Sequence, residues 1–581
     1  MSVTPLLWRL PWKDHEMSSQ RDGQAPEGLE LPATSSDEQA TEGLELPTTS
    51  SAWAPLASRA FCWLWVANIV NSLGTWIQNT ASGWIMTDLA PSPIMVSLVQ
   101  TAAQLPVFLL ALPAGALADL MDRKRNLMLT NMFMLAVAGA LAIFAALGHV
   151  DATVLLVMTA LLAVGAALNN PAWGASVQLT VPRQDLPQAL VLNSVGFNIA
   201  RVVGPAVAGL ILATAGATIA FAANAASFAF VVVVVGAVLT FPRPQTSIDV
   251  PPEPFRSAMR IGAAYSLAEP VVRSALVRSA AFYGCGSAIW ALLPLYVRQV
   301  LGLSSASFGV MMGVIGAGAV LGALAMPRLR KLLPRNNLIM LSGASCGLAL
   351  IPLAIIPSAI TAHAALLVFG IAWIVGATNL QATVQLAAAP WVRARVLALY
   401  QAVFNGGMGL GAIFWGWLGD HAGLTGTILA AGVASCVIAL LTRAVELPAE
   451  ISDPSAPARP VRRTLSIAAE MAPLLHSARH GLVVAISYHI DPANAAAFRA
   501  AMADVRLSRY RDGAVGCMLS RDVSDPTRWV ETFRLRDWHE LQRAIGRHNL
   551  ADSEAVVRAR SYHIGAEPPR LTLLLLQEHA E

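Results

Sequence analysis

Charged residues are scarce in this chain of 581 residues. Asp, Glu, Lys and Arg make up 13% of the sequence, hydrophobic residues make up 55%, and the mean hydropathy is +0.57. Soluble globular domains carry about 25% charged residues, so this composition excludes a soluble protein of such a length. The formal net charge is only +4, and the basic residues lie between apolar runs, which argues against a nucleic-acid partner. The composition predicts a protein that crosses a membrane many times.

Cysteine is scarce as well. The cysteines form no CxxC pair and no Cys/His pattern of the kind that binds a metal. Four of the five fall within apolar runs, where a free thiol behaves as a small hydrophobic side chain. We therefore expect packed core residues, with no metal site and no cofactor, at Cys62, Cys285, Cys346, Cys436 and Cys517.

The first 58 residues hold no apolar segment followed by a small-residue cleavage site, so we expect no cleavable signal peptide. Residues 27–36 return almost unchanged at 42–51, in surroundings rich in Pro, Ser, Thr and acidic residues. Such a biased repeat is typical of disorder. We predict a disordered cytoplasmic tail over residues 1–58.

Long apolar runs dominate the chain as far as residue 446. A helix that spans a bilayer needs about 20 apolar residues. Twelve stretches meet this need, at 60–87, 93–118, 127–148, 153–179, 189–214, 217–240, 275–298, 304–327, 337–357, 360–388, 395–419 and 424–445. With the amino terminus inside, the inner loops carry about sixteen Lys and Arg residues, and the outer loops carry about one, Arg298. This asymmetry predicts an inner (plasma) membrane protein with both termini in the cytoplasm.

The twelve spans divide into two related halves, residues 59–240 and 275–446. Motifs recur between them at a constant offset of 207 residues. The recurring positions are 115–118 with 322–325, 177–179 with 384–386, Leu190 with Leu397, Leu192 with Leu399, Phe197-Asn198 with Phe404-Asn405, Gly204 with Gly411, and Gly209 with Gly416. Between the halves, the loop 241–274 is expected to hold an amphipathic cytoplasmic helix. Parallel repeats of this kind place a substrate cavity between two bundles that rock around it.

A charged motif joins spans 2 and 3, and it reads Gly115-Ala-Leu-Ala-Asp119-Leu-Met-Asp122-Arg123-Lys124-Arg125. With the six-plus-six arrangement and the long central loop, it makes residues 59–446 resemble the major facilitator superfamily. The resemblance implies alternating access and a conformational latch formed by Gly115, Asp119, Asp122, Arg123, Lys124 and Arg125. The usual motif has Gly where this chain has Asp122, and the second half has Met326 where Asp119 would recur. The latch is therefore expected mainly in the first half.

Span 5 places an arginine inside an apolar run, in Asn198-Ile-Ala-Arg201-Val-Val-Gly204-Pro205-Ala-Val-Ala-Gly209. A charge at membrane depth is costly unless it faces a cavity or a partner. The segment resembles the Gly-Pro motif of superfamily exporters, in the form of the enterobactin-exporter-like branch, although Ala208 stands where the strict pattern has Gly. The resemblance implies gating and cavity roles for Asn198, Arg201, Gly204, Pro205 and Gly209.

Neutral amides and aromatic residues at membrane depth supply the other candidates for a substrate cavity. An amide there is as suited to bonding two helices as to lining a cavity, and an aromatic ring as suited to packing or to the lipid belt. The cavity candidates are Asn71, Trp76, Gln78, Gln104, Asn169, Trp290, Asn379 and Asn405.

Acidic residues are absent from the middle third of every expected span. Proton-coupled carriers usually need a carboxylate or histidine whose pKa changes between the two facing states. The candidates that remain lie near span ends, at Asp88, Asp119, Asp122, His363 and Asp420. Proton coupling therefore follows from the family resemblance alone.

The composition changes again after the last span. A Pro-rich basic linker over 447–464 precedes a soluble segment, 465–581, whose pattern predicts the order β-α-β-β-α-β of a ferredoxin-like α+β domain. With Trp529, Glu531, Phe533, Trp538 and His548, it resembles small domains of the antibiotic-biosynthesis monooxygenase type. The resemblance implies a dimerisation or regulatory module, with a cofactorless oxygenase or a ligand sensor as the alternative.

The fold class expected is thus an all-α polytopic membrane protein of two pseudo-symmetric six-helix bundles, with a carboxy-terminal α+β ferredoxin-like domain. We predict a secondary transporter and not an enzyme, in contact with membrane lipid, that exports a small amphipathic siderophore or drug-like compound in exchange for protons. A homodimer through the carboxy-terminal domain is plausible. The alternative is a bifunctional or sensory membrane protein whose carboxy-terminal domain binds or oxidises a small molecule. An importer is disfavoured only by the Gly204-Pro205 segment.

Overall fold

The computed structural model describes residues 51, 53–238, 255–444, 481–547 and 550–576. Within them, twelve helices are long and apolar enough to cross a membrane, which confirms the predicted fold class. They are α1 (Arg59–Leu89), α2 (Pro93–Leu120), α3 (Arg123–Ala146), α4 (Ala152–Leu179), α5 (Leu186–Thr214), α6 (Gly216–Val238), α8 (Pro270–Leu295), α9 (Ser305–Leu332), α10 (Arg335–Ile355), α11 (Ala359–Ala387), α12 (Arg393–Ala422) and α13 (Leu424–Leu441). Nearly all of the expected tail, part of the central loop and the linker 447–464 lie outside the described residues.

Glycine lets the helices of each half approach one another closely. Gly74 of α1 faces Ser227 of α6 so tightly that a β-carbon would lie 2.7 Å from the Ser227 Cβ. In the second half, a β-carbon on Gly347 of α10 would lie 2.4 Å from the Gly432 carbonyl oxygen of α13. Lipid tails are as apolar as leucine, so spanning helices gain their stability from such close packing.

The two halves repeat the same contacts at the same offset of 207 residues. The rings of Trp76 and Phe197 lie 6.4 Å apart in the first half, and those of their equivalents, Tyr283 and Phe404, lie 4.7 Å apart in the second. Gly204 packs on α1 and its equivalent Gly411 packs on α8. The internal repeat read from the sequence is therefore a structural repeat.

A short amphipathic helix, α7 (Phe255–Ala268), leads into the second half. Its Tyr265 hydroxyl donates to the Ala387 carbonyl and accepts from the Ala389 amide, each at 3.1 Å. Gly262 of α7 lies directly against the Arg395 side chain of α12. These contacts fix α7 to the second half, at the end of the bundle where α8 begins.

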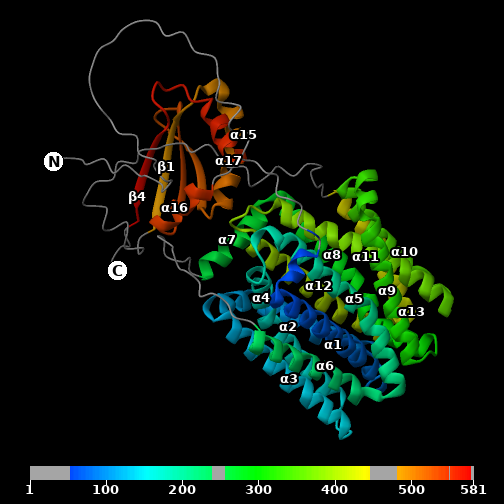
Figure 1. Cartoon of the computed structure of the whole chain (residues 1–581). Helices are drawn as coiled ribbons and strands as arrows, with labels where there is room; N and C mark the ends of the chain where they lie inside the picture. The colour runs from blue at the N-terminus through cyan, green and yellow to red at the C-terminus, as the bar shows by residue number, and fades with distance from the viewer. Residues whose placement is uncertain (1–50, 52, 239–254, 445–480, 548–549, 577–581) are drawn as a thin grey trace, which may run out of the picture.

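The carboxy-terminal segment forms one four-stranded sheet with helices. Its elements are β1 (Leu482–His489), α15 (Ala495–Arg511), β2 (Val515–Arg521), β3 (Arg528–Leu535), α16 (Trp538–Arg547), α17 (Leu550–Arg560) and β4 (Arg570–Leu575). The strand order is β2-β3-β1-β4 with every neighbouring pair antiparallel, as the predicted ferredoxin-like order requires. Alternate residues of β1 and β3 are buried, and they pack with Phe498, Met502 and Val505 of α15. The ribbon shows α15 and α17 beside the sheet (Figure 1).

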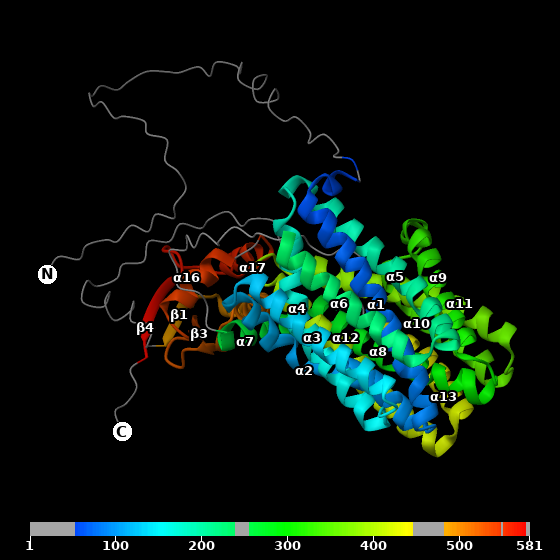
Figure 2. The ribbon, with the colours of Figure 1, turned by 60° about the horizontal axis from the view of Figure 1, so that its bottom comes forward.

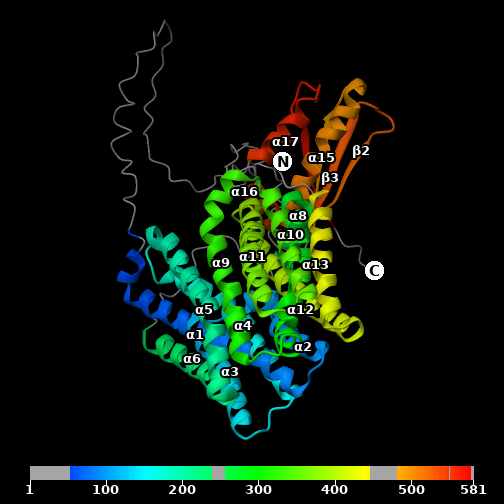
Figure 3. The same cartoon turned by 90° about the vertical axis from the view of Figure 1, so that its right-hand side faces the viewer.

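The carboxy-terminal sheet and its helices lie against α7, beyond one end of the second-half helices (Figures 2 and 3). Arg511 at the end of α15 forms an ion pair of 2.9 Å with Glu269, which directly precedes α8. Arg260 of α7 approaches Glu540 of α16 at 3.9 Å. The soluble part is thus joined to the membrane part through α7 and the start of α8.

Candidate functional site

The two halves meet mainly through two pairs of helices, α2 with α12 and α5 with α9. Gly209 of α5 comes so close to α9 that a β-carbon there would lie 2.6 Å from the Ser305 carbonyl oxygen and 2.9 Å from the Gly309 Cα. The equivalent residue of the repeat, Gly416 of α12, lies in the same way against α2, where a β-carbon would be 3.0 Å from the Ile94 Cα. We call these two close contacts, at Gly209 and at Gly416, the joints between the halves. Both joints are therefore made at repeat-related glycines.

Polar contacts join the halves at the same end of the bundle. Arg298 of the second half forms an ion pair with Asp88 of the first half and donates to the Thr87 hydroxyl at 3.0 Å. The Gln299 amide donates to the Pro91 carbonyl at 3.1 Å. Because α8 runs from α7 to this group, the joined end is the one far from the carboxy-terminal sheet.

Aromatic side chains meet across the middle of the interface. The Trp76 ring of α1 lies 6.2 Å from the Trp290 ring of α8, and Trp290 lies 5.7 Å from Trp373 of α11. Phe197 of α5 extends this group on the first-half side, through its contact with Trp76. We name these four residues the ring cluster. Such tilted pairs present faces on which a flat apolar compound can stack.

Arg201 occupies the middle of α5, one helical turn from Phe197. Its Nη2 donates to Asn198 Oδ1 at 2.9 Å, while Asn198 donates through Nδ2 to the Ser194 carbonyl at 2.8 Å. The Arg201 Nε is buried and has no hydrogen-bond partner within the described part of the chain. Gly204, one turn further on, packs against Trp76, so that Phe197, Arg201 and Gly204 share one face of α5.

Two of the cavity candidates are buried and bonded within the first half. Gln78 Oε1 accepts from Asn224 of α6 at 3.4 Å. Asn169 Oδ1 accepts from the Thr130 hydroxyl at 3.0 Å and from Asn131 Nδ2 at 2.9 Å, both on α3. In these bonds the amides hold neighbouring helices together.

The candidate amides of the second half are buried too. Asn379 Nδ2 donates to the Val375 carbonyl at 2.8 Å, and Asn405 Nδ2 donates to the Gln401 carbonyl at 2.6 Å. The Asn405 bond is the repeat equivalent of the bond from Asn198 to the Ser194 carbonyl. This face of α12 therefore copies the face of α5 that carries Arg201.

Asn71 and Gln104 are half-buried. The Asn71 Oδ1 atom is buried and has no hydrogen-bond partner among the described residues. Gln104 lies on α2 against Gly409 of α12, at the interface between the halves. Pro205 lies at the same interface, with its carbonyl oxygen 2.5 Å from where a β-carbon on Gly309 would be. Gln104 and Pro205 are thus placed at the interface between the halves, whereas Gln78 and Asn169 bond to other helices of their own half.

The proposed latch residues lie at the end of the bundle opposite the joints. Asp122 accepts from the Arg125 amide at 2.9 Å and thereby caps the start of α3. Lys124 donates to the Gly236 carbonyl at the end of α6, at 2.9 Å. Arg123 is half-buried and Arg125 is exposed. Gly115 and Asp119 belong to α2, but the side chain of Asp119 and the surroundings of Gly115 are outside the described part of the structure.

The sequence matches a family model described as transmembrane secretion effector over residues 50–581, through all twelve spans and the carboxy-terminal sheet. The chain belongs to this family of major facilitator superfamily transporters. Its family and its relatives are transporters rather than enzymes.

Two curated relatives illustrate the range of the family. The staphyloferrin A transporter of Staphylococcus aureus is 25% identical over 281 residues, which cover 48% of this chain and 70% of the relative. The multidrug efflux pump Tap of Mycolicibacterium fortuitum is 23% identical over 389 residues, 66% of this chain and 94% of the relative.

Solved structures share the fold of the membrane part. A bacterial homologue of the human lysosomal transporter Spinster, inward-facing and unoccupied, superposes with a TM-score of 0.55 at 14% identity, over 68% of this chain and 99% of that one. A POT family transporter in complex with 5-aminolevulinic acid gives a TM-score of 0.55 at 12% identity, over 66% and 95%. Likeness at this identity establishes the fold, with which alternating access is consistent.

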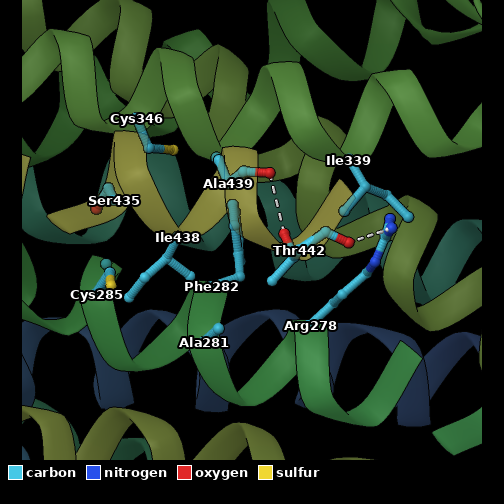
Figure 4. Close-up of a pocket in the computed structure, with 12 residues that line it drawn as sticks. Arg278, Ala281, Phe282, Cys285, Ile339, Cys346, Ser435, Ile438, Ala439 and Thr442 are labelled. Carbon is cyan, nitrogen blue, oxygen red and sulfur yellow. Dashed lines mark hydrogen bonds between the residues drawn. The ribbon is translucent and has the colours of Figure 1, made fainter. Parts of the chain in front are cut away.

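The transporter also has a small cavity inside its second half, between α8, α10 and α13 (Figure 4). It encloses about 30 Å³, which is room for a water molecule but not for a ligand of drug size. Arg278 closes one end of it by donating to the Thr442 carbonyl. Its lining includes Phe282 and Gly286, which pack against Trp373, so the cavity lies behind the ring cluster within the second half.

A buried polar group lies beneath the carboxy-terminal sheet of the transporter. Glu531 accepts from the Tyr488 hydroxyl at 3.1 Å and from Arg509 Nε at 3.0 Å. Burial opposes the charge of Arg509, but the carboxylate of Glu531 outweighs it and raises the pKa of the guanidinium. Burial and the nearby Glu531 raise the pKa of the Cys517 thiol to about 11. Arg509 and Glu531 form a satisfied ion pair that stabilises the domain.

The residues that carry the monooxygenase resemblance are placed as core. Trp529, Phe533 and Trp538 are buried, and Glu531 belongs to the ion pair with Arg509. His548 lies outside the described residues. Among those that are described, no three His, Cys, Asp or Glu side chains are grouped to hold a metal ion. The relation to monooxygenase-type domains stays a prediction.

Sequence reasoning missed one feature of the interface, the ion pair between Asp88 and Arg298. Each residue was noted for another reason, but their pairing was not foreseen. Trp373 and Phe197 of the ring cluster belong to the aromatic residues at membrane depth that the sequence offers for a cavity.

Proposed function

We propose that the protein exports a small amphipathic compound across the inner membrane by alternating access, in exchange for protons. The observation that carries this proposal is the ring cluster, which lies where the halves meet, beside a membrane-depth cation and next to the glycine joints. In this proposal both termini lie in the cytoplasm, so the joined end faces outward and the joined arrangement corresponds to the inward-facing state of the cycle.

The class of substrate follows from the chemistry of the cluster and from the relatives. Indole and phenyl rings stack on flat apolar groups, and the amides nearby offer hydrogen bonds. One relative is named as a transporter of the siderophore staphyloferrin A and another as a multidrug efflux pump. A siderophore or a drug-like compound is the corresponding substrate for this chain.

The residues divide into three roles in this proposal. Gly115, Asp119, Asp122 and the cations of 123–125 latch the inner end when the transporter faces outward. Gly204, Pro205 and Gly209 allow α5 to move against α1 and α9. The ring cluster and Arg201, with Asn71, Gln104 and Asn198, contact the substrate.

Proton coupling is assigned to carboxylates near the span ends. Asp420 accepts from the Ile94 amide at 3.5 Å, across the interface between the halves. Asp119 lies in the latch motif. If either carries the coupling proton, its replacement by Asn abolishes pH-driven export, and unchanged export in both variants would remove these two residues from the coupling.

The carboxy-terminal sheet is assigned a regulatory or dimerisation role. It is fixed to α7 rather than to the interface between the halves. In this role it adjusts transport without contacting the transported compound.

The decisive experiment is transport into inverted membrane vesicles. A panel of siderophores and dyes is supplied outside the vesicles, with and without an imposed proton gradient, to wild type, Arg201→Ala and the control Arg273→Ala. Arg273 is exposed at the start of α8 and donates to the Leu267 carbonyl, far from the ring cluster. Gradient-dependent uptake that Arg201→Ala abolishes and Arg273→Ala preserves supports the proposal. Uptake into right-side-out vesicles alone would identify an importer instead.

A further inference from the structure

Arg201 is a cation at membrane depth that forms no ion pair with any residue the structure describes. Among the described residues, its side-chain hydrogen-bond partner is the neutral amide of Asn198. Its Nε is buried and bonds to none of the described groups. An arginine in the middle of a spanning helix is costly unless a counter-charge or several hydrogen bonds compensate it. The guanidinium therefore has capacity to bind an anion.

The repeat shows that packing does not require this arginine. Residues 197 and 198 of α5 are Phe and Asn, and so are 404 and 405 of α12, with the same bond from the amide to the carbonyl four residues earlier. Gly204 and Gly411 match as well. Between Asn405 and Gly411 of α12, the position equivalent to Arg201 holds Met408, which is 3% exposed. The fold accepts an apolar side chain at this place, so the charge of Arg201 serves another purpose.

The surroundings of Arg201 define what an anion bound there would contact. Phe197 lies one turn before it and Gly204 one turn after it on the same face of α5, and both contact Trp76. Trp76 in turn contacts Trp290 of the second half. The guanidinium thus lies along one side of the ring cluster, where the halves meet.

We infer that Arg201 binds a carboxylate or similar oxyanion on the transported compound, whose flat apolar part stacks on the ring cluster. This inference rests on the proposed function and names its substrate as an amphipathic anion. A guanidinium offers planar paired N–H donors that match a carboxylate, and it keeps its charge at every physiological pH. The same charge repels an amphipathic cation, so the site selects by sign of charge as well as by shape.

The test compares aromatic acids with their uncharged amides. Three pairs, built on benzene, naphthalene and pyrene, are titrated against the purified full chain in detergent by equilibrium dialysis. Wild type is expected to prefer the acid in at least one pair by about tenfold or more, the change that 1.4 kcal/mol makes in a dissociation constant. Arg201→Met should remove that preference and leave amide binding within about twofold, because apolar burial is unchanged.

Three controls keep the result interpretable. Arg201→Met copies the residue at the equivalent position of the second half, so it is the variant most compatible with the fold, and its thermal midpoint is measured beside wild type. Arg201→Lys keeps the charge without the planar fork and should retain part of the preference. Arg273→Gln removes an exposed cation of the same helix bundle and should retain all of it.

Two results would overturn the inference: no preference for the acid in any pair, or a preference that survives Arg201→Met. The vesicle experiment distinguishes a failure of this inference from a failure of the proposed function. Export of neutral compounds by a protein without acid preference would leave the proposed function standing and end the inference. Arg201-dependent acid binding without any export would support an anion site at Arg201 and end the proposed function.

Discussion

Arg298 of the second half and Asp88 of the first half form an ion pair at the end where the halves are joined, and the Arg298 guanidinium also lies 5.7 Å from the centre of the Trp84 ring. Their side chains are 37% and 50% exposed, so solvent weakens the pair. Exposed pairs contribute about 0.2–1 kcal/mol. The ion pair is therefore strong enough to favour the state in which this end is joined over the state in which it is open. It is also weak enough to break during a transport cycle.

We expect Asp88→Asn to shift the protein away from the joined state, by up to about fivefold in the ratio of states. Nitroxide labels at Leu147 and Ile360, which are exposed on different halves at this end, should report a larger population of long distances. The charge exchange Asp88→Arg with Arg298→Asp should restore the wild-type distances.

The matched control is Asp151→Asn. Asp151 carries the same charge at the same end of the first half, but its side chain caps α4. An equal shift in Asp151→Asn would mean that the surface charge matters and the pair with Arg298 does not.

Gly209→Leu is expected to prevent the α5–α9 joint from closing. A side chain there would collide with the Ser305 carbonyl and the Gly309 backbone, neither of which can move aside as a flexible side chain could. Overpacking of this kind costs about 1–3 kcal/mol, so the population of the joined state should fall by about five- to a hundred-and-fiftyfold relative to the open state, and export should fall with it. Gly174→Leu in α4 has open space around the new side chain and should transport normally. If the distance between the labels at Leu147 and Ile360 in Gly209→Leu equals that of wild type, the close packing of α5 on α9 is contradicted.

The sequence predicted the framework of the molecule well. Each expected span overlaps a helix, and the offset of 207 residues anticipated that Gly209 and Gly416 have equivalent places. Hydropathy belongs to each helix by itself, and the repeat can be read along the sequence. Both predictions succeed because neither depends on how the helices are turned in the bundle. The roles of the amides depend instead on which way each helix is turned in the bundle. Asn169 and Arg201 both read as polar residues at membrane depth, yet Asn169 bonds to α3 while Arg201 lies beside the ring cluster.

The contact between the soluble part and α7 could not be predicted, because its partners are far apart in the sequence. Arg511 and Glu269 are separated by 242 residues, and each is an ordinary charged residue in its local sequence. Both side chains become largely buried only when the two parts come together, at 22% and 14% exposure.

Glu269→Gln is expected to loosen the carboxy-terminal sheet from α7 without unfolding it. The loss of a largely buried, charge-assisted contact costs about 1–2 kcal/mol. Amide hydrogen exchange at the end of α15 should speed up by about five- to thirtyfold, which corresponds to that energy. Exchange in β1 and β3 should stay as in wild type.

The comparison variant is Asp504→Asn, which breaks the exposed pair with Arg558 inside the soluble part. It should leave exchange at the end of α15 unchanged. Acceleration throughout β1 and β3 in Glu269→Gln would show that the residue supports the fold of the sheet rather than its attachment.

Cys517 is expected to resist alkylation at neutral pH. Burial, with the carboxylate of Glu531 nearby, raises its pKa to about 11, so the reactive thiolate is a very small fraction at pH 8. Iodoacetamide labelling should be about a hundredfold slower than at a Cys placed at Val523, which is fully exposed in the same domain, and it should accelerate as the pH rises toward 11. A rate equal to that of Val523→Cys at pH 8 would refute the buried environment.

The attachment of α7 has a mechanical consequence. Tyr265 fastens this helix to the second half, Glu269 fastens the sheet to its end, and the joints between the halves lie at the opposite end of the bundle. When one half tilts against the other about those joints, displacement grows with distance from the pivot, and the attached sheet lies beyond the end of the second half that is far from the joints. A small rotation within the membrane thus becomes a wide swing of the sheet. A fluorophore on the sheet, measured against one on the first half, would read out the direction in which the transporter faces.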